Sequence, residues 1–577
     1  MAPDQRSGTP EPCLKKSQPN PKGENGRACG QARNPHESVK NHKFRIGDRG
    51  LGLMRKDQLM KRRQEIFCRV DRAVNRRRFL LTGGAAGAAA AGLAGPGPAA
   101  AARSGKMRLR VVYALHAVKQ HTADWPNRGF DFAPVMERIN DALAQAFPDY
   151  EFRPATASGP IQAEKIILGD VASGIDGYIV VQMNNWNLVV QPFAATGKPV
   201  LFVPFLYGGT GGFLVFNSRF LRQNRSQVGF VSSSNLDDLI AAVNCFERVK
   251  PTGAAADFAA AVAQVRRERT PGPGDLAGLA DPLSARSPEE TLRKMRESKI
   301  LAVGYPGVSL KGLPMIPMRM LSFGKLNAAW KAADRNQAAA IAEGWRQSAA
   351  AVEGVSEETL ASSAAMYLGM KKLMQEHGAN AITVNCLVGF YGGFIHAYPC
   401  LGFHELCNEG LVGACECDVR STATMLAINA MTRGRPGYIS DPVLDTATRR
   451  IIYAHCVASN RPFGPQGPAN PFQILTHSED RQGASVRSIL PSGYMTSTLE
   501  FASGRKQILF HQAKALANDP DDRACRTKLV AEPVGDIEKL FTQWDQWGWH
   551  RVTVYGDLKE PVLALADAMG YELVPEA

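Results

Sequence analysis

YIVVQMNNWNLVVQPFAATGKPVLFVP, residues 178–204, contains the two apolar runs that decide the fold class. The runs are Tyr178–Gln182 and Pro199–Pro204, and both are bounded by Gly or Pro. Short, unbroken apolar runs of this kind are typical of strands buried on both faces. Upstream, Arg108–Ala114 is a similar run and Phe132–Phe147 has helical periodicity. Strands that alternate with helices predict a parallel, doubly wound sheet.

The same alternation returns in the second half of the chain. Lys299–Gly304 is a strand-like run, and Ala381–Leu387 (AITVNCL) is another, with helices expected near Gln337–Val352 and Glu357–Glu376 between them. After about residue 470 short strands are separated by turns, which predicts a mainly antiparallel module. The fold class is therefore α/β, with two doubly wound parallel-sheet domains before that module.

The chain has 577 residues, too many for one core, so several domains are expected. The predicted divisions are 1–74 for a disordered basic extension, 75–103 for an export signal, 104–295 and 296–440 for the two α/β domains, and 441–577 for a β-rich C-terminal domain. Met54 and Met60 are alternative starts, so the sequence leaves open whether the whole extension is translated.

The formal net charge of +14 belongs almost entirely to the N-terminus. Residues 1–103 hold 21 Lys and Arg against 8 Asp and Glu, whereas the rest of the chain holds 47 against 46. A nearly neutral body has no broad field that attracts phosphate backbones. Nucleic-acid binding is therefore rejected as the main function.

Asn75–Leu81 (NRRRFLL) resembles the bacterial twin-arginine export signal. An uncharged run over 79–102 follows, and its end, rich in Ala, suits a cleavage site. The alternative is a membrane-spanning helix, but six glycines and two prolines make the run weakly apolar. We expect export to the periplasm, with membrane contact only through the translocation machinery; cleavage and anchoring both stay open.

The body contains eight cysteines, six of them between residues 386 and 456. Their spacing includes no C-x-x-C pair, so it matches no standard zinc site. Buried free thiols are the expected state. A thiol-based redox or zinc protein is the weakest of the functional hypotheses.

The segment from Ala381 to His455 carries the most specific motifs. Its centre is GLVGACECDVRSTATMLAINAMTRGRPGYISDPV, residues 410–443, with a Glu-x-Asp pair, a small-residue helix, a Gly-Arg-Pro turn and an Asp-headed strand. The residues are Glu416, Asp418, Thr424-Met425, Gly434–Pro436 and Asp441, followed by Ala454-His455-Cys456 and the late segment Gly548–Val554 with His550. Together they resemble the L-fucose/L-arabinose isomerase superfamily, most closely over roughly 380–577.

This resemblance implies a C-terminal β-barrel, a sugar or polyol substrate and metal-assisted aldose–ketose isomerisation through an enediol. It implies Glu416, Asp418, His455 and His550 as metal ligands, with Glu416 and Asp418 also catalytic and Mn²⁺ as the expected divalent ion. The chemistry requires a base that removes a carbon-bound proton, a charge that stabilises the enediolate and an acid that returns the proton.

Simpler roles compete at each of these positions. Extended backbone would put the side chains of Glu416 and Asp418 on one face. Asp418 could instead be an ordinary helix N-cap, and Glu416 a salt-bridged surface residue. His455 and His550 are more often structural than ligands when judged without the resemblance.

The chain also departs from the family pattern. Fucose isomerase-like members carry a further metal-binding carboxylate upstream, whereas residues 381–403 contain no Asp or Glu. His396, Cys400 and His404 stand there instead, with Glu405 just beyond. Position 551 is Arg where arabinose isomerase-like members carry a second His. The ligand set has drifted, or the metal chemistry has been lost.

Substrate contacts are expected from Asn185 and Trp186, which follow a predicted strand, and from His404. Loop packing is the ordinary alternative for Trp186. A second hypothesis for the whole protein is a non-catalytic, exported sugar-binding protein that keeps the cleft without the metal site. The sequence leaves the sugar and the oligomeric state, including a homo-oligomer, open.

Replacing Arg76 and Arg77 by Lys is expected to trap the precursor in the cytoplasm, because the run after them is too weakly apolar for ordinary membrane insertion. Cell fractionation of the tagged chain measures this. Normal export of the double variant would show that the twin-arginine interpretation is wrong.

Overall fold

The computed structural model describes residues 106–248, 255–281, 283–304 and 313–577. The basic extension expected over 1–74 and the signal expected over 75–103 lie outside these residues. Among the described helices, none is both long enough and apolar enough to cross a lipid bilayer.

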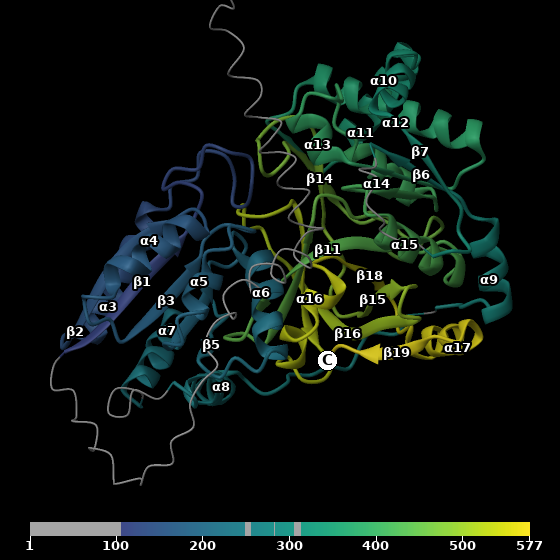
Figure 1. Ribbon diagram of the computed structural model, residues 1–577. Coiled ribbons are helices and arrows are strands. Elements are labelled where there is room, and N and C mark those ends of the chain that lie inside the picture. The colour runs from purple at the N-terminus through teal and green to yellow at the C-terminus, as the bar shows by residue number, and fades with distance from the viewer. Residues whose placement is uncertain (1–105, 249–254, 282, 305–312) are drawn as a thin grey trace, which may run out of the picture. The chain divides into compact units, whose positions relative to one another are not determined.

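Five parallel strands form the first sheet, in the order β2-β1-β3-β4-β5 (Figure 1). They are β1 (Met107–Ala114), β2 (Tyr150–Ala157), β3 (Gly177–Gln182), β4 (Val200–Pro204) and β5 (Val228–Phe230). The runs quoted from the sequence are β1, β3 and β4, and every residue of β3 and β4 is buried. The predicted doubly wound sheet is confirmed.

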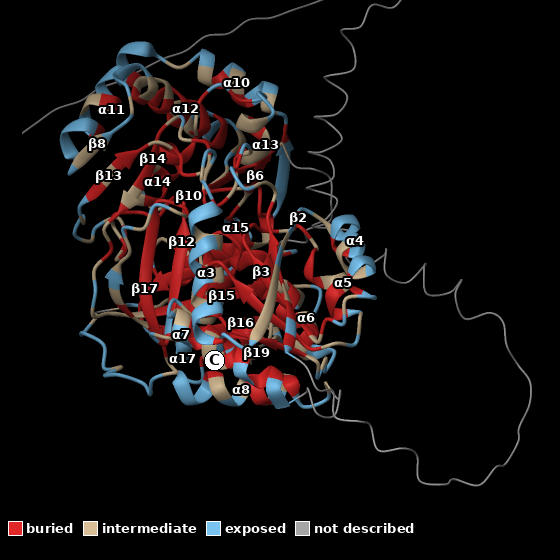
Figure 2. Ribbon diagram, turned by 90° about the vertical axis from the view of Figure 1, so that its left-hand side faces the viewer, coloured by how far each residue is buried: buried red, intermediate tan, exposed pale blue. Residues whose placement is uncertain are grey.

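Helices cover both faces of this sheet, because alternate strand residues point to opposite sides. Leu109 and Val111 pack with one helix layer, and Val112 and Ala114 with the other. The first layer contains α3 (Ala133–Ala146), α7 (Leu236–Val243) and α8 (Phe258–Arg269); the second contains α4 (Pro160–Asp170), α5 (Val190–Ala194) and α6 (Thr210–Arg222). Figure 2 shows that α3 keeps an exposed outer face.

The second sheet has four parallel strands in the order β10-β9-β6-β7. They are β6 (Ile300–Val303), β7 (Met318–Leu321), β9 (Ala381–Val384) and β10 (Val412–Ala414). One face packs on α9 (Pro288–Glu297) and α15 (Val419–Met431), the other on α10 (Phe323–Lys331), α12 (Glu357–His377) and α14 (Cys400–Asn408), with α11 (Arg335–Ser348) against α12.

One strand of this sheet is shorter than the sequence predicts. The run Ala381–Leu387 ends as a strand at Val384, and α13 (Cys386–Tyr391) begins two residues later. The strand β8 (Ala351–Glu353) does not belong to this sheet. It pairs with β13 (Phe472–Leu475), which also pairs with β14 (Ser485–Ser488).

The C-terminal strands form a six-stranded antiparallel barrel, as expected. Its order is β15-β18-β11-β12-β17-β16, and β15 pairs with β16 to close the ring. The strands are β11 (Tyr438–Asp445), β12 (Arg450–His455), β15 (Met495–Ala502), β16 (Gln507–Asn518), β17 (Thr527–Pro533) and β18 (Arg551–Tyr555). The helix α17 (Lys559–Met569) and the strand β19 (Glu572–Pro575) follow, and β19 lies parallel to β16.

A buried ion pair lies inside this module. Both side chains of Arg551 and Glu576 are inaccessible to solvent and lie 2.8 Å apart, and the guanidinium stacks 4.0 Å from the ring centroid of Trp544. Nδ1 of His511 donates to Glu576 over 2.7 Å. Burial alone would raise the pKa of Glu576, but Arg551 and His511 hold it at about 2.

Arg551→Ala is expected to lower stability by about 3–5 kcal/mol, because it leaves the Glu576 carboxylate buried without its cation. Thermal and urea unfolding measure this. The control is Arg505→Ala, which removes an arginine 4.1 Å from the Trp547 ring that has no buried carboxylate partner among the described residues. Equal losses of stability for Arg551→Ala and Arg505→Ala would contradict the role of the ion pair.

In the wild type, the stability contributed by Glu576 is full above its unfolded pKa and is lost as the pH falls towards about 2.

Candidate metal centre

The centre begins at the sharp turn between β10 and α15. Glu416 and Cys417 both have positive φ angles, 61° and 54°, a left-handed conformation that costs energy for residues with a Cβ. The extended backbone expected over Glu416 to Asp418 is therefore not present. Backbone strain of this kind persists where the surrounding structure enforces it, as it often does at functional sites.

Asp418 ends this turn as the N-cap of α15. Its Oδ1 accepts from the backbone N–H groups of Arg420 at 3.0 Å and Ser421 at 3.1 Å. Its Oδ2 accepts from the Ser421 hydroxyl and from Nδ1 of His550, both at 2.8 Å. Burial raises the pKa of Asp418, but these bonds and the charge of His550 bring it well below its usual range. The carboxylate stays ionised and has no spare capacity for an additional ligand.

The bond from Asp418 also fixes the orientation of His550. Because Nδ1 is held by the carboxylate, Nε2 points away from it, towards the other side chains of the centre. Metal-binding histidines commonly have a carboxylate on the ring nitrogen opposite the ion. Asp418 thus lies behind His550, as the partner of a ligand.

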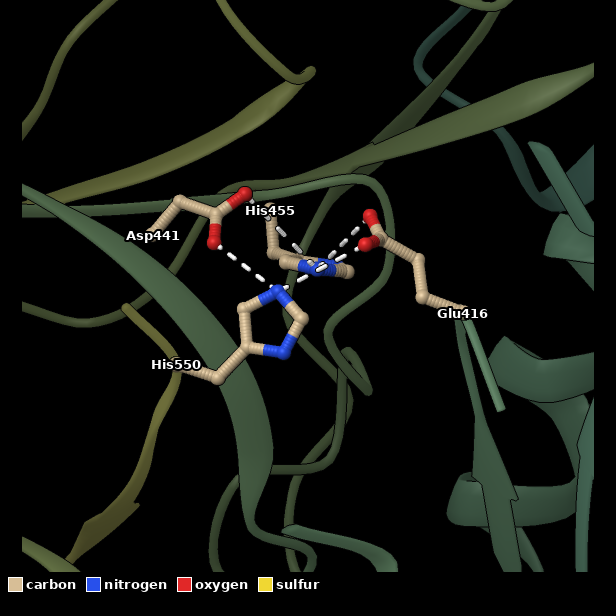
Figure 3. A group of neighbouring side chains, drawn as sticks. All are labelled: Glu416, Asp441, His455 and His550. Atoms are coloured by element: carbon tan, nitrogen blue, oxygen red, sulfur yellow. Dashed lines mark ion pairs between the residues drawn. The ribbon is translucent and has the colours of Figure 1, made fainter. Parts of the chain in front are cut away.

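Four side chains converge at the centre: Glu416, Asp441, His455 and His550 (Figure 3). Nε2 of His550 is 3.1 Å from Oδ1 of Asp441 and 3.6 Å from Oε2 of Glu416. Nε2 of His455 is 3.9 Å from Oε1 of Glu416 and 4.0 Å from Oδ2 of Asp441. One ligand atom from each residue lies within 4.8 Å of the others.

Four different segments of the chain supply these residues. Glu416 follows β10 of the second sheet, whereas Asp441 lies in β11 and His455 ends β12 of the barrel. His550 comes immediately before β18. In the barrel register Asp441 pairs with Ala454, the residue before His455 at the end of β12.

Several polar atoms of this group are buried without a hydrogen bond. Both ring nitrogens of His455 and Oδ1 of Asp441 have no hydrogen-bond partner among the described residues, and the side chains of His455 and Asp441 are only 1% and 5% exposed. Burial lowers the pKa of His455 to about 4, so its imidazole is neutral near pH 7 and keeps a lone pair. Leaving such groups buried and unpaired is costly.

A divalent cation fits this donor set. Oxygen and nitrogen ligands that lie about 2.0–2.4 Å from an ion can be no more than about 4.8 Å apart, which matches the spacing here. Two carboxylates and two imidazoles suit Mn²⁺ and similar borderline cations. The Glu416 side chain is 28% exposed, whereas the other three are 9% exposed or less, so the centre opens to solvent beside Glu416.

The other residues expected at the site lie elsewhere. His404 donates from Nδ1 to the Ala458 carbonyl at 2.8 Å and packs against Phe472, and Glu405 accepts from Trp345 at 3.1 Å. Neither belongs to the four-residue group, and a substrate contact by His404 stays a prediction.

The loop after β3 reaches the neighbour of His550. The rings of Trp186 and Trp549 lie 5.7 Å apart, and Trp125 lies 5.4 Å from Trp549 on another side. Asn185 uses its Oδ1 to accept from the Gly212 backbone at 3.1 Å. Trp186 therefore packs near the centre, and its contact with a substrate stays a prediction.

Asp441 belongs to the sequence motif but is not expected from it as a metal ligand, because it stands in an ordinary-looking strand. A signal is present in hindsight: every residue of YISDPVLD is buried, so a charged side chain there requires a partner. The eight described cysteines are all free and buried, as expected.

The chain shows distant, partial homology to sulfoquinovose isomerases. It is 27% identical over 219 residues to the enzyme of that name from Clostridium sp. (strain MSTE9), which covers 36% of this chain and 46% of the relative. For the relative from Priestia aryabhattai the identity is 23% over 223 residues, covering 37% and 48%. The chain thus spans about half the length of the curated relatives it matches.

No family model matches the chain. Among solved structures, an ABC-transporter solute-binding protein from Bacillus halodurans with bound myo-inositol covers 58% of this chain and 92% of its own length. Its sequence identity is 13% and its TM-score 0.17, so this likeness carries no argument.

Asp441→Asn is expected to weaken Mn²⁺ binding by more than about 100-fold, because altering even the groups behind a ligand typically costs 10–100-fold. Calorimetric titration and elemental analysis measure this. The control is Asp445→Asn on the same strand, whose carboxylate instead accepts from Ser234 at 2.8 Å. Unchanged affinity in the Asp441 variant would remove this residue from the ligand set.

Proposed function

We propose that this protein is a metal-dependent isomerase that interconverts an aldose and a ketose. The observation that carries the proposal is the mostly buried group of Glu416, Asp441, His455 and His550, with unpaired ligand atoms that a cation would satisfy. Distant homology to sulfoquinovose isomerases supports the same reaction class. The proposed substrate is an aldose such as sulfoquinovose, after which those relatives are named.

The four residues would hold a divalent cation, with Mn²⁺ as our proposal. When bound, such an ion supplies positive charge that stabilises the oxygens at C1 and C2 of the sugar. Asp418 keeps the His550 imidazole aimed into the centre, and His455 contributes a neutral ring. The tryptophans beside His550 form an apolar wall, of the kind that sugar faces pack against.

The proposed location is the periplasm, and it rests on Asn75–Leu81 alone. The twin-arginine route carries proteins that have already folded. A protein that loads a metal before export would gain from that order of events.

The protein supplied with Mn²⁺ is expected to convert at least one aldose to its ketose. The assay is NMR of a panel that contains fucose, arabinose, glucose and sulfoquinovose, run beside elemental analysis. Glu416→Gln keeps the side-chain size and removes the charge, so metal content and conversion should both fall sharply while the thermal unfolding midpoint changes little.

A metal-free protein that stays inactive with added Mn²⁺ would overturn the isomerase. If that protein still bound a sugar, the non-catalytic sugar-binding alternative would take its place.

A further inference from the structure

The centre described above lacks a free acid–base residue. Glu416 belongs to the group that would hold the cation and would give it a ligand oxygen. Asp418 already accepts four hydrogen bonds, and its pKa lies well below the range in which a carboxyl group exchanges protons near neutrality. An enediol route nevertheless requires one group that removes a carbon-bound proton and gives it back.

Glu479 is a carboxylate that lies outside the candidate ligand group and, unlike Asp418, is not saturated with hydrogen-bond donors. It lies in the loop between β13 and β14, and its Oε2 accepts from the Tyr391 hydroxyl at 2.6 Å. No Arg or Lys of the described ranges forms an ion pair with it. One oxygen is thus held in place and the other is available to a substrate.

The loop that carries Glu479 is fastened to the strand that carries His455. Nε2 of His477 lies 3.5 Å from Sγ of Cys456, the residue after His455. The His477 ring also packs against the rings of Phe390 and Tyr391 at the end of α13. The loop that carries Glu479 is therefore fixed near the end of β12, where His455 lies.

The backbone of Glu479 is fixed from the first domain. The N–H of Arg128 donates to the Glu479 carbonyl at 2.8 Å, and Arg128 lies in the segment that follows β1. Tyr391 follows β9, and Glu416 follows β10. Glu479 thus meets segments beyond the carboxyl ends of parallel strands in both sheets, where ligands of such folds bind.

The electrostatic surroundings suit proton transfer. Burial, together with the carboxylates of Asp124 and Glu416, raises the pKa of Glu479 to about 7. The charge of His477 and the Tyr391 hydrogen bond act in the opposite direction. The effect of Glu416 also indicates that Glu479 lies near the metal centre, although it is not part of it.

We propose that Glu479 is the catalytic acid–base residue of the aldose–ketose interconversion, a role that rests on the function proposed above. Its carboxylate takes the proton from C2 of the aldose, the C2–H electron pair forms the C1–C2 double bond of the enediol, and the π pair of the C1 carbonyl moves onto its oxygen. Glu479 then returns that proton to C1. The proton of the C2 hydroxyl moves to the oxygen at C1, so aldose and ketose balance.

Glu479→Gln is expected to lower kcat at least 100-fold with an unchanged metal content, since acid–base catalysis typically contributes 10²–10⁴-fold. Solvent deuterium should no longer enter C1 of the ketose. The matched control is Glu409→Gln, because Glu409 also accepts from a tyrosine, Tyr367, but is paired with Lys371 and lies outside the centre. This variant should keep wild-type kcat.

The pH profile separates proton transfer from a structural role. Activity should rise with pH as Glu479 loses its proton near pH 7. Tyr391→Phe removes a bond that stabilises the ionised form, so the acidic limb should move to higher pH. An infrared carboxyl band that titrates in the wild type and is missing from Glu479→Gln gives a readout independent of turnover.

The outcomes distinguish the two proposals. An active wild type whose Glu479→Gln variant keeps its kcat and its acidic limb overturns the role of Glu479 and leaves the isomerase standing. A metal-loaded wild type that converts no aldose overturns both.

Discussion

The hydrogen bond between Asp418 and His550 connects the parts of the molecule on which the site depends. Asp418 caps α15, which packs on the second sheet, and His550 precedes β18 of the barrel. The same carboxylate therefore begins a helix, links that helix to the barrel and fixes an imidazole. Because Asp418 is ionised and saturated with donors, the His550 ring has little freedom to turn.

This constraint leaves two carboxylates close together, and a bound cation would offset their charges. With His550 fixed, Glu416 and Asp441 are held close together in a mostly buried position, and His455 adds a neutral ring without hydrogen bonds. Burial and the neighbouring carboxylates raise the pKa of Glu416 to about 7, which measures how unfavourable a second negative charge is there. A bound divalent ion would offset both charges and use the lone pairs of His455.

The sequence predicts the fold well because the fold rests on periodicity. Runs such as Tyr178–Gln182 are buried on both faces and carry no competing signal. The site is less predictable. All four residues stand in motifs, but the sequence does not show that Asp441, which pairs with Ala454 in the barrel, joins the group in place of Asp418. The positive φ angles at Glu416 and Cys417 have no sequence signature either, since neither residue is Gly or Asn.

The sequence motifs also do not identify Glu479. Its loop has no periodicity, and its importance arises only from the segments that meet there. Residues 381–403 lack any acid, so the upstream carboxylate of the family pattern is missing from this segment. The same segment supplies Tyr391, whose hydroxyl holds a carboxylate contributed by the β13–β14 loop. A carboxylate held by a phenol and kept apart from the ligand group can exchange a proton while Glu416 and Asp441 remain with the cation. The loss of an upstream acid is thus compatible with retained isomerase chemistry, provided that the ligand and proton-transfer roles are divided between different carboxylates.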